Sequence, residues 1–402
     1  MDFEFHYTEE QEEFRKEVRA FIEENAYKEP LVPNDPLKVT VEQWNDGRAL
    51  QRKLGAKGWY GAGYPKEYGG GGLDREHRAI LAEEFAKIRR ERRWPGGTEV
   101  SRIQTSGLMR YGTEEQKQRF MPGLLSGESY NFQAFTEPDA GTDEASMKST
   151  AIRNGNVYVV NGTKVFVGAC PPPLRPDYLY WPAVTDLKAP RHQNISAFFI
   201  PGDLPGITYT PLNLIAAEAQ KWEVICEDVR CSAECLIGEE NKGWLVTQAT
   251  LAAEHGGGGV IAPREDSLTL TFIDYCKKTM RNGQPLSRDP RVQEILVQLY
   301  IEDNVSRLWG LRNFAMADGQ IDRIPYTGTQ TSLHNKRYSP ILGKAFMDIL
   351  GPDCLINDPE FWVLAGEVEH QVRLADVTHI GGTPETQQIM MSRGLGLGRG
   401  AA

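Results

Sequence analysis

One short segment, from Phe135 to Asp143, combines the residue types that let a loop backbone bind a flat ring. It reads Phe-Thr-Glu-Pro-Asp-Ala-Gly-Thr-Asp. A Thr hydroxyl, small residues and a Gly let such a backbone press against a ring and direct N–H groups at it. Close behind it, Asn161-Gly162 follows an alternating apolar run, which predicts a tight hairpin turn. By local composition alone, the two halves indicate a Gly-containing loop beside a hairpin, with a backbone that could approach a flat ring closely.

Bulk composition places these residues in an ordinary globular protein. The chain has 402 residues, of which 40% are hydrophobic and 25% charged, enough for two or three domains with a substantial core. No apolar run approaches the roughly 20 residues of a membrane-spanning helix. The formal charge of −10 argues against nucleic acid as a partner, but a few local donors can still hold an anionic cofactor.

The cysteines predict neither a disulfide framework nor a metal site. Six cysteines are too few and too irregularly spaced to staple a chain of this length. Cys231 and Cys235 are close in sequence, yet no second Cys pair or His pair completes a metal site.

The first residues, Met1 to Phe5, lack the basic flank and apolar stretch of a targeting peptide. A cytoplasmic location is therefore expected.

Residues 1–130 are predicted to form an α-helical domain. Thr8-Glu9-Glu10-Gln11 and Thr113-Glu114-Glu115-Gln116 both have the form of a capping box, which marks a helix start. The run from Gly69 to Gly72 lies between them and is predicted to be a flexible connector, because consecutive glycines stabilise neither helix nor strand.

Residues 131–236 are predicted to form a β domain, and residues 237–402 a helical bundle. Short β-branched or aromatic runs bounded by Gly, Pro, Asn and Asp predict strands at Val157–Val160, Ile195–Ile200 and Glu223–Cys226. After Trp244 the helical period returns, and about four or five helices fit. The helical stretches are Leu251–Glu254, Asp266–Met280, Val292–Met316, Leu342–Leu350 and Phe361–Leu374. The expected fold is mainly α with a central β domain.

This order of domains, together with motifs spread along most of the chain, resembles the acyl-CoA dehydrogenase family. The matching segments are Pro65–Gly70, Gly112–Lys117, Phe135–Asp143, Val159–Val167, Asp228–Arg230, Asp348–Gly351 and Gly381–Gln387. The resemblance implies an N-terminal helical domain, a middle β-barrel, a C-terminal helical bundle and bound FAD. It also implies that a base removes the α-proton of an acyl-CoA thioester while a hydride leaves the β-carbon for flavin N5.

The base of such a reaction is a carboxylate in a dry pocket, because desolvation raises the pKa of a carboxyl group. Many family members carry it in a Glu-Gly-Thr motif near the C-terminus, where this chain has Gly381-Gly382-Thr383. A second branch, similar to isovaleryl-CoA and some bacterial steroid-side-chain enzymes, carries it on an early helix of the bundle. Counting eleven residues on from the Gly243-Trp244 pair, as in that branch, reaches Glu254, the predicted base.

The resemblance assigns the flavin ring to the middle domain and the far end of FAD to a neighbouring subunit. Thr136 would hydrogen-bond the ring edge, Phe166 would pack on the ring where the family has Trp, and Gly168 replaces a frequent Thr or Ser. The implied residues around the ring are Phe135, Thr136, Gly141, Thr142, Phe166, Val167 and Gly168. Those implied at the far end are Arg281, Gly351, Gly382, Thr383 and Glu385.

The implied substrate is an acyl-CoA. The N–H of Gly381 would donate to the thioester carbonyl, where negative charge builds as the proton leaves. His255 stands where the family usually has Arg, so any substrate contact it makes would be weaker and pH-dependent. The glycines Gly256–Gly259 suggest a cavity wide enough for a bulky or cyclic acyl group. Substrate contacts are expected from Thr142, Leu251, Glu254, His255 and Gly381.

Two alternatives remain open from the sequence. One is a flavoenzyme of the same fold with different chemistry, as in acyl-CoA oxidases, nitroalkane oxidases and desulfinases. The other is a binding subunit without activity. Under the leading interpretation the electrons pass to an electron-transfer flavoprotein, and the active form is a homodimer or homotetramer. The sequence leaves the identity of the acyl group undetermined.

Overall fold

The computed structural model describes residues 7–26, 39–88, 100–215, 221–254, 267–317, 324 and 326–397. The chain forms two compact units. The first, which we call the bundle unit, comprises Met1–Asp35, Arg75–Arg93 and Gly259–Ala402. The second, the sheet unit, comprises Pro36–Asp74 and Trp94–Gly258. Each unit combines segments from distant parts of the chain, and the three consecutive domains 1–130, 131–236 and 237–402 stay a prediction.

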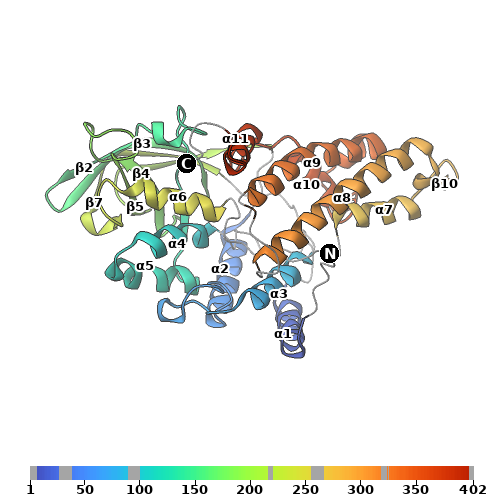
Figure 1. Ribbon diagram of the computed structural model, residues 1–402, viewed down its shortest axis with the longest axis horizontal. Coiled ribbons are helices and arrows are strands. Elements are labelled where there is room, and N and C mark those ends of the chain that lie inside the picture. Colours follow the sequence, from blue (N-terminus) through green and yellow to red (C-terminus); the bar gives the residue numbers. More distant parts are fainter. Residues whose placement is uncertain are drawn as a thin grey trace. The chain divides into compact units, whose positions relative to one another are not determined.

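Eight strands form the sheet of the sheet unit (Figure 1). They are β1 (Asn131–Gln133), β2 (Thr150–Asn154), β3 (Val157–Gly168), β4 (Tyr178–Val184), β5 (Ile195–Pro201), β6 (Ile207–Leu212), β7 (Lys221–Ser232) and β8 (Leu236–Ile237). Their order is β6-β7-β3-β2-β4-β5-β8, with β1 also paired to β4. The strands predicted at Val157–Val160, Ile195–Ile200 and Glu223–Cys226 are confirmed within β3, β5 and β7.

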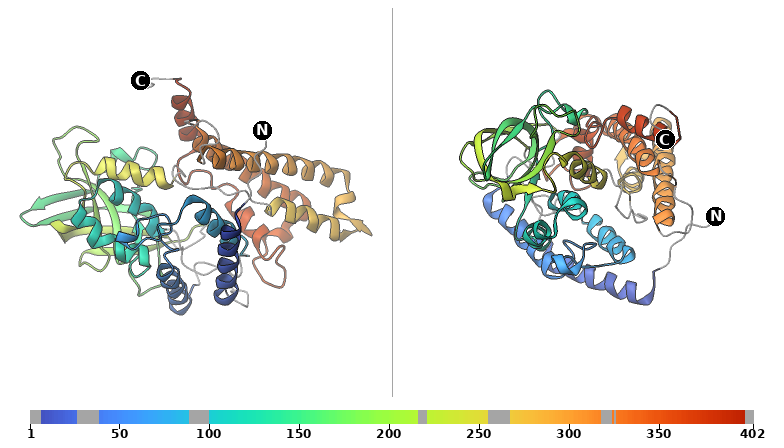
Figure 2. Two further views of the ribbon diagram at one scale, coloured as in Figure 1. Left: turned by 60° about the horizontal axis from the view of Figure 1, so that its bottom comes forward. Right: turned by 60° about the vertical axis from the view of Figure 1, so that its left-hand side comes forward.

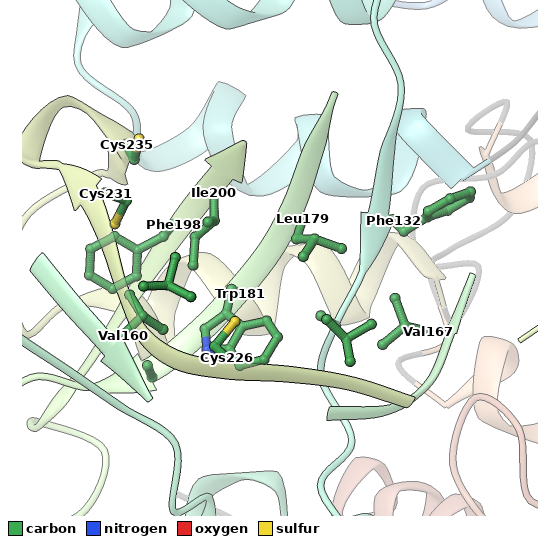
Figure 3. Packing of buried hydrophobic residues seen from close by; sticks show 14 of the residues in the cluster. Phe132, Val160, Val167, Leu179, Trp181, Phe198, Ile200, Cys226, Cys231 and Cys235 are labelled. Atoms are coloured by element: carbon green, nitrogen blue, oxygen red, sulfur yellow. The ribbon is translucent and has the colours of Figure 1, made fainter. Parts of the chain in front are cut away.

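The sheet curls on itself, as the right-hand view of Figure 2 shows, and its interior is filled by buried apolar side chains. Trp181, Phe198 and Val160 are fully buried there, and their side chains lie in the same layer (Figure 3). Phe132 from β1 packs edge-to-face on Trp222 from β7, with ring centroids 6.0 Å apart. Burial of these large side chains stabilises the unit, at roughly 25 cal/mol for each Å² of apolar surface removed from water.

The predicted hairpin turn at Asn161-Gly162 is wrong. These residues lie inside β3, and the turn between β2 and β3 is instead Gly155-Asn156, flanked by the pair Asn154 and Val157. Side-chain bonding overrides the turn propensity of Asn161. Its Oδ1 accepts a hydrogen bond from the Asp228 backbone N–H at 2.8 Å, and its Nδ2 donates to the Asp228 carboxylate at 3.1 Å.

Four helices of the sheet unit complete its described layers: α2 (Val41–Ala56), α4 (Val100–Tyr111), α5 (Glu114–Ser126) and α6 (Gly243–Glu254). Helix α6 packs against one face of the sheet, mainly along β5 (Figure 1). The capping box predicted at Thr113 is confirmed at the start of α5, and α2 begins with another, built on Thr40 and Gln43. Helices α4 and α6 touch at Gly107, where a Cβ would lie 2.7 Å from the Val246 carbonyl oxygen.

The glycine run is a loop, but it is packed, not loose. It follows the short 3-10 helix η2 (Lys66–Tyr68). The N–H groups of Gly70, Gly71 and Gly72 all donate to carbonyls of residues 61–65 at 2.9–3.1 Å. A Cβ on Gly70 would lie 2.2 Å from the Tyr64 carbonyl oxygen, so a side chain cannot fit. The predicted flexible connector is therefore wrong, because close backbone approach, not freedom, requires glycine here.

The bundle unit is built from helices of both ends of the chain. They are α1 (Glu9–Asn25), α3 (Arg75–Ala86), α7 (Leu268–Lys278), α8 (Pro290–Ala317), α9 (Thr327–Leu350), α10 (Glu367–Leu374) and α11 (Pro384–Gly394), with a small hairpin of β9 (Met280–Arg281) and β10 (Gln284–Pro285). The capping box predicted at Thr8 is confirmed at α1. Helices α8, α9 and α10 lie side by side (Figures 1 and 2). Among the described residues, no helix combines the length and apolar character that a bilayer crossing requires.

Candidate functional site

The segment predicted to bind a planar group forms a tight turn at the edge of the sheet unit. Glu137 and Ala140 exchange two backbone hydrogen bonds of 3.0 and 3.1 Å around Pro138-Asp139. The carbonyl of the half-buried Thr136 accepts a hydrogen bond of 2.8 Å from the backbone N–H of Val165 in β3. We call residues 135–142 the ring loop. The loop and the second half of β3 therefore run side by side.

A buried ion pair holds the ring loop to β3. Lys164 is fully buried, and its ammonium donates to the Glu137 carboxylate at 2.8 Å and to the Phe135 carbonyl at 3.0 Å. The backbone N–H groups of Lys148 and Ser149 also donate to the Glu137 carboxylate, at 2.6 and 3.1 Å. Burial opposes the charge on Glu137, but these donors outweigh it and hold the pKa of the carboxyl below its ordinary value.

Two β-bulges turn the side chain of Phe166 out of the sheet. Between the pairs Val160–Val229 and Gly162–Cys226, β7 has one extra residue. Between Lys164–Val224 and Val167–Trp222, β3 has one extra residue, so the register is restored. Phe166 lies in this second bulge with φ 59°, and 50% of its surface is exposed. A bulky residue with positive φ is strained, and such strain concentrates at functional positions.

The space around two glycines tests whether a flavin ring fits. At Gly141 an added Cβ would meet only the Thr136 Cγ2 at 3.9 Å, so the protein leaves that side open. At Gly168 an added Cβ would lie 2.4 Å from the Phe132 ring, so no hydroxyl-bearing residue can stand there. An exposed aromatic at Phe166, an open Gly141 and an exposed Thr142 fit a planar group. Gly168 has only its backbone to offer, and the buried Val167 packs in the core.

Helix α6 carries the predicted base position and shares a core with the ring loop. The Phe135 ring packs edge-to-face on Tyr180 of β4 at 5.2 Å between centroids. The Tyr180 hydroxyl in turn lies 3.4 Å from the Thr247 hydroxyl on α6. Leu251 packs against the same core. Glu254 is the last residue of α6, seven positions after Thr247, so it has the same position around the helix axis.

The structure does not describe the Glu254 side chain, and His255 and Gly256–Gly259 lie outside the described residues. What it does describe is the support for position 254. Thr250, one turn earlier, donates its hydroxyl to the Val246 carbonyl at 3.0 Å and faces Gly107 of α4. The end of α6 is therefore held by α4 and by the sheet.

The predicted far-end residues lie in the bundle unit, at two helix ends. Arg281 donates to the Ile349 carbonyl at 2.7 Å and so caps the end of α9, and Gly351 ends that helix with φ 74°. At the other end, Thr383 caps α11 by accepting from the Thr386 N–H at 3.2 Å. Glu385 is exposed in the first turn of α11, where its own backbone N–H lowers the pKa of its carboxyl.

Two glycines precede α11 in left-handed conformations. Gly381 has φ 66° and Gly382 has φ 85°. The Gly381 carbonyl accepts a hydrogen bond of 2.9 Å from the Gln387 side chain, which fixes the peptide after it. Both conformations suit glycine and would strain other residues.

Among the described residues, the cysteines and acidic side chains form neither a disulfide nor a cluster of metal ligands. All six cysteines are buried thiols outside any disulfide. Within the described part of the chain, no three His, Cys, Asp or Glu side chains lie close enough to share a metal ion.

Family models match two consecutive parts of the chain. The model of the acyl-CoA dehydrogenase N-terminal domain matches residues 8–128, and that of the middle domain matches residues 133–229. Isovaleryl-CoA dehydrogenase of Pongo abelii is 32% identical over 298 residues, which cover 73% of this chain and 68% of the relative. The chain belongs to the acyl-CoA dehydrogenase family. Acyl-CoA dehydrogenase IpdE1 of Mycobacterium tuberculosis is 28% identical over 407 residues, covering 97% of this chain and 98% of the relative.

Solved structures of this family have the same fold. The ChsE4–ChsE5 complex from Mycobacterium tuberculosis superposes with a TM-score of 0.78 at 27% identity, covering 98% of this chain and 100% of the other. The Tcur3481–Tcur3483 steroid ACAD has a TM-score of 0.77 at 27% identity, covering 99% and 100%. The predicted fold class is thus confirmed.

As an acyl-CoA dehydrogenase, the protein is an FAD-dependent oxidoreductase, and the named relatives do not favour the oxidase, nitroalkane or desulfinase alternatives.

The sequence interpretation missed Glu137 and Lys164 as supports of the site. A signal for Lys164 was present, because Tyr158 and Val160 fix which alternate positions of β3 face the core. A Lys at an inward position must find a carboxylate. The partner could not be chosen from spacing alone, since Glu137 and Lys164 are 27 residues apart.

Proposed function

We propose that Glu254 is the base that removes the α-proton of an acyl-CoA thioester. The observation that supports this most is the continuous packing from Phe135 of the ring loop through Tyr180 to Thr247 of α6. It makes the ring loop and the helix that ends at Glu254 parts of one rigid layer. A base and a ring-binding loop fixed in this way keep their separation, as proton removal coupled to hydride loss requires.

The residues of the ring loop would bind and orient the flavin. Thr136 would donate its hydroxyl to the ring edge, Phe166 would cover one ring face, and Gly141 with Thr142 would adjoin the substrate. Bound FAD supplies the hydride acceptor. Phe135, Val167 and Gly168 would act by shaping this pocket, since the first two are buried and the third offers only backbone.

The Gly381 N–H is proposed as a donor to the thioester carbonyl, where its role is to stabilise negative charge as the α-proton leaves. The Lys336 ammonium donates to the Ile380 carbonyl, which belongs to the same peptide as this N–H, and the fixed peptide supports the role. Arg281, Gly351, Gly382, Thr383 and Glu385 are proposed to hold the far end of FAD bound to a neighbouring subunit. Leu251 and His255 are proposed to contact the acyl-CoA.

Glu254→Gln tests the assignment of the base. The variant should keep bound FAD and its yellow colour but lose α-proton exchange and turnover by roughly 10²–10⁴-fold, because the amide cannot accept the proton. Exchange of the α-proton into deuterated water, followed by NMR, measures the step directly. Glu115→Gln, which changes an exposed carboxylate on α5, is the matched control. Undiminished exchange in Glu254→Gln would remove Glu254 from this role.

The acyl group is proposed to be bulky or cyclic. Four consecutive glycines, Gly256–Gly259, follow His255 in the sequence, so these four positions carry no side chains. A steroid enzyme among the solved structures of similar fold supports this substrate class. Anaerobic bleaching of bound flavin by thioesters of linear, branched, aromatic and steroid acids would rank them. Bleaching by short linear acyl-CoAs alone would contradict the proposal.

The active form is proposed to be a homodimer or homotetramer in the cytoplasm that passes electrons to an electron-transfer flavoprotein. An apolar stripe on α8, formed by Val297, Tyr300, Ile301 and Leu308, is half or more exposed and lies on one helix face. A second copy of this chain would cover it. Sedimentation of the purified FAD-loaded protein tests this. A loaded monomer, or a requirement for a different chain as in the ChsE4–ChsE5 complex, would overturn the homomer.

A further inference from the structure

The Glu137–Lys164 pair joins three segments at one buried carboxylate. Lys164 belongs to β3, Glu137 to the ring loop, and the N–H groups of Lys148 and Ser149 to the segment that enters β2. Every one of these bonds ends on the same carboxylate. Lys164 also donates to the Phe135 carbonyl, the residue directly before Thr136. The position of Thr136 is thus set from both sides by one ammonium group and one carboxylate.

The same pair borders the bulge that exposes Phe166. Lys164 is the last paired residue of β3 before the extra residue, and the next backbone N–H, that of Val165, donates to the Thr136 carbonyl. Lys164 itself packs under Trp181, with its ammonium 5.5 Å from the ring centroid. A single buried side chain therefore anchors both ring-facing elements, the ring loop and the Phe166 bulge.

Stability does not account for an ion pair in this place. A buried ion pair costs several kcal/mol of desolvation for each ion, and apolar residues of similar volume are often as stabilising. An exposed ion pair on the same turn provides a comparison. Lys148 and Asp139 pair at 2.7 Å with side chains 72% and 70% exposed. The buried pair differs from it in fixing backbone atoms as well as charges.

We propose that Lys164 and Glu137 are positioning residues for the flavin: their buried ion pair holds Thr136 and Phe166 in the geometry that binds the ring. The proposal rests on the assignment of the ring loop to flavin made above. Neither side chain is proposed to touch the reacting atoms. Their effect is on how tightly and in what orientation the ring is held.

Lys164→Met is the decisive variant, with Lys148→Met as its matched control. Each variant removes one ammonium group that pairs with a carboxylate of the ring loop. The pair lost in Lys164→Met is buried, and the pair lost in Lys148→Met is exposed. We expect the dissociation constant of FAD, measured by quenching of flavin fluorescence at low temperature where both variants stay folded, to rise at least tenfold for Lys164→Met. The visible circular dichroism of residual bound flavin should change too. Lys148→Met should match the wild type in both.

Glu137→Gln gives a graded second test and keeps the shape of the site. The amide oxygen can still accept the bonds that reach one carboxylate oxygen, from the Ser149 N–H and the Lys164 ammonium, while the bond from the Lys148 N–H to the other oxygen is lost. Lys164 also keeps its bond to the Phe135 carbonyl. FAD affinity should therefore fall by less than in Lys164→Met. This variant also provides the measurement if Lys164→Met does not fold.

A purely structural role would give a different pattern. If Lys164→Met or Glu137→Gln lowered the melting temperature yet bound FAD with wild-type affinity and an unchanged dichroism spectrum, the positioning role would be refuted. These outcomes are independent of Glu254, because FAD binding does not need the base. A failure of the α-proton exchange test would leave this proposal standing, and the reverse also holds.

Discussion

A buried carboxylate lies at the centre of an ion network in each unit, Glu84 in the bundle unit and Glu137 in the sheet unit. Glu84 of α3 pairs with Arg15 at 2.7 Å and Arg19 at 2.9 Å, both from α1, and with Lys87 at 3.2 Å. Arg19 and Lys87 are about half exposed. Within the described part of the chain, Glu137 is hydrogen-bonded to one cation, Lys164, and otherwise to backbone donors. The first network is redundant and includes half-exposed cations, whereas the second offers no second hydrogen-bonded cation among the described residues.

The difference indicates two uses of buried charge. In the bundle unit the network joins two helices, and Arg15 also pairs with Glu83 at 2.6 Å, so losing one bond leaves others. In the sheet unit every bond converges on the loop proposed to hold the flavin. Redundancy suits a structural joint, because several geometries are acceptable there. A single, dry pair suits a site where only one geometry works.

The largest effect on stability is expected for Lys164→Met. It leaves the Glu137 carboxylate buried without its cation, which costs about 3–5 kcal/mol. Urea unfolding of the FAD-free protein measures this difference, with Lys148→Met as the exposed control. A loss below about 1 kcal/mol would mean that water reaches Glu137, and the contrast between the two networks would disappear.

A smaller loss, about 1–3 kcal/mol, is expected for Arg15→Met, because Arg19 and Lys87 still bond Glu84. The affinity for FAD should not change, since this network lies in α1 and α3. The same urea titration and a flavin binding measurement provide both numbers. Reduced FAD affinity in Arg15→Met would show that the two networks are not separate in function.

The smallest expected effect is a difference in acid sensitivity. Burial opposes charge on Glu84, but hydrogen bonds from Arg19, Arg15 and Lys87 lower the pKa of its carboxyl to about 2. A depressed carboxyl pKa contributes stability above its ordinary value of 4.5 that is lost as the pH falls toward 2. Glu84→Gln should therefore be less stable than the wild type at pH 6 and approach it near pH 3. Parallel pH profiles of unfolding for the two proteins would contradict this.

The sequence predicts helix starts well where side chains within three residues of the start determine them. The capping boxes at Thr8 and Thr113 are confirmed because the Thr and Gln side chains satisfy helix N–H groups within three residues. Strand β4 went unpredicted because it contains Pro182. That residue lies between Tyr180, which pairs with β1, and Val184, which pairs with β2, so its missing N–H interrupts no ladder bond there.

Tertiary contacts explain what the sequence could not provide. Asn161-Gly162 has the composition of a turn, and only the partner Asp228, far along the chain, keeps it inside a strand. Helix α9 begins at Thr327, well before the predicted stretch at Leu342. Its first half was not predicted because a start rich in Thr and Ser has weak helix propensity, and it depends instead on packing against α8. The residue types of the ring loop were enough to predict a ring-binding role, which stays a prediction, but they did not reveal the buried cation that fixes the loop.

The paired bulges of β3 and β7 have a consequence for changing the cofactor environment. One strand gains a residue at Asp228 and the other at Phe166, so the offset cancels and Val167 pairs with Trp222 as if neither existed. The side chain at 166 can therefore be exchanged for a larger or smaller aromatic while the interior of the sheet keeps its packing. Under the proposed packing of Phe166 on the flavin, substitutions at this position would change the environment of the ring without rebuilding the scaffold.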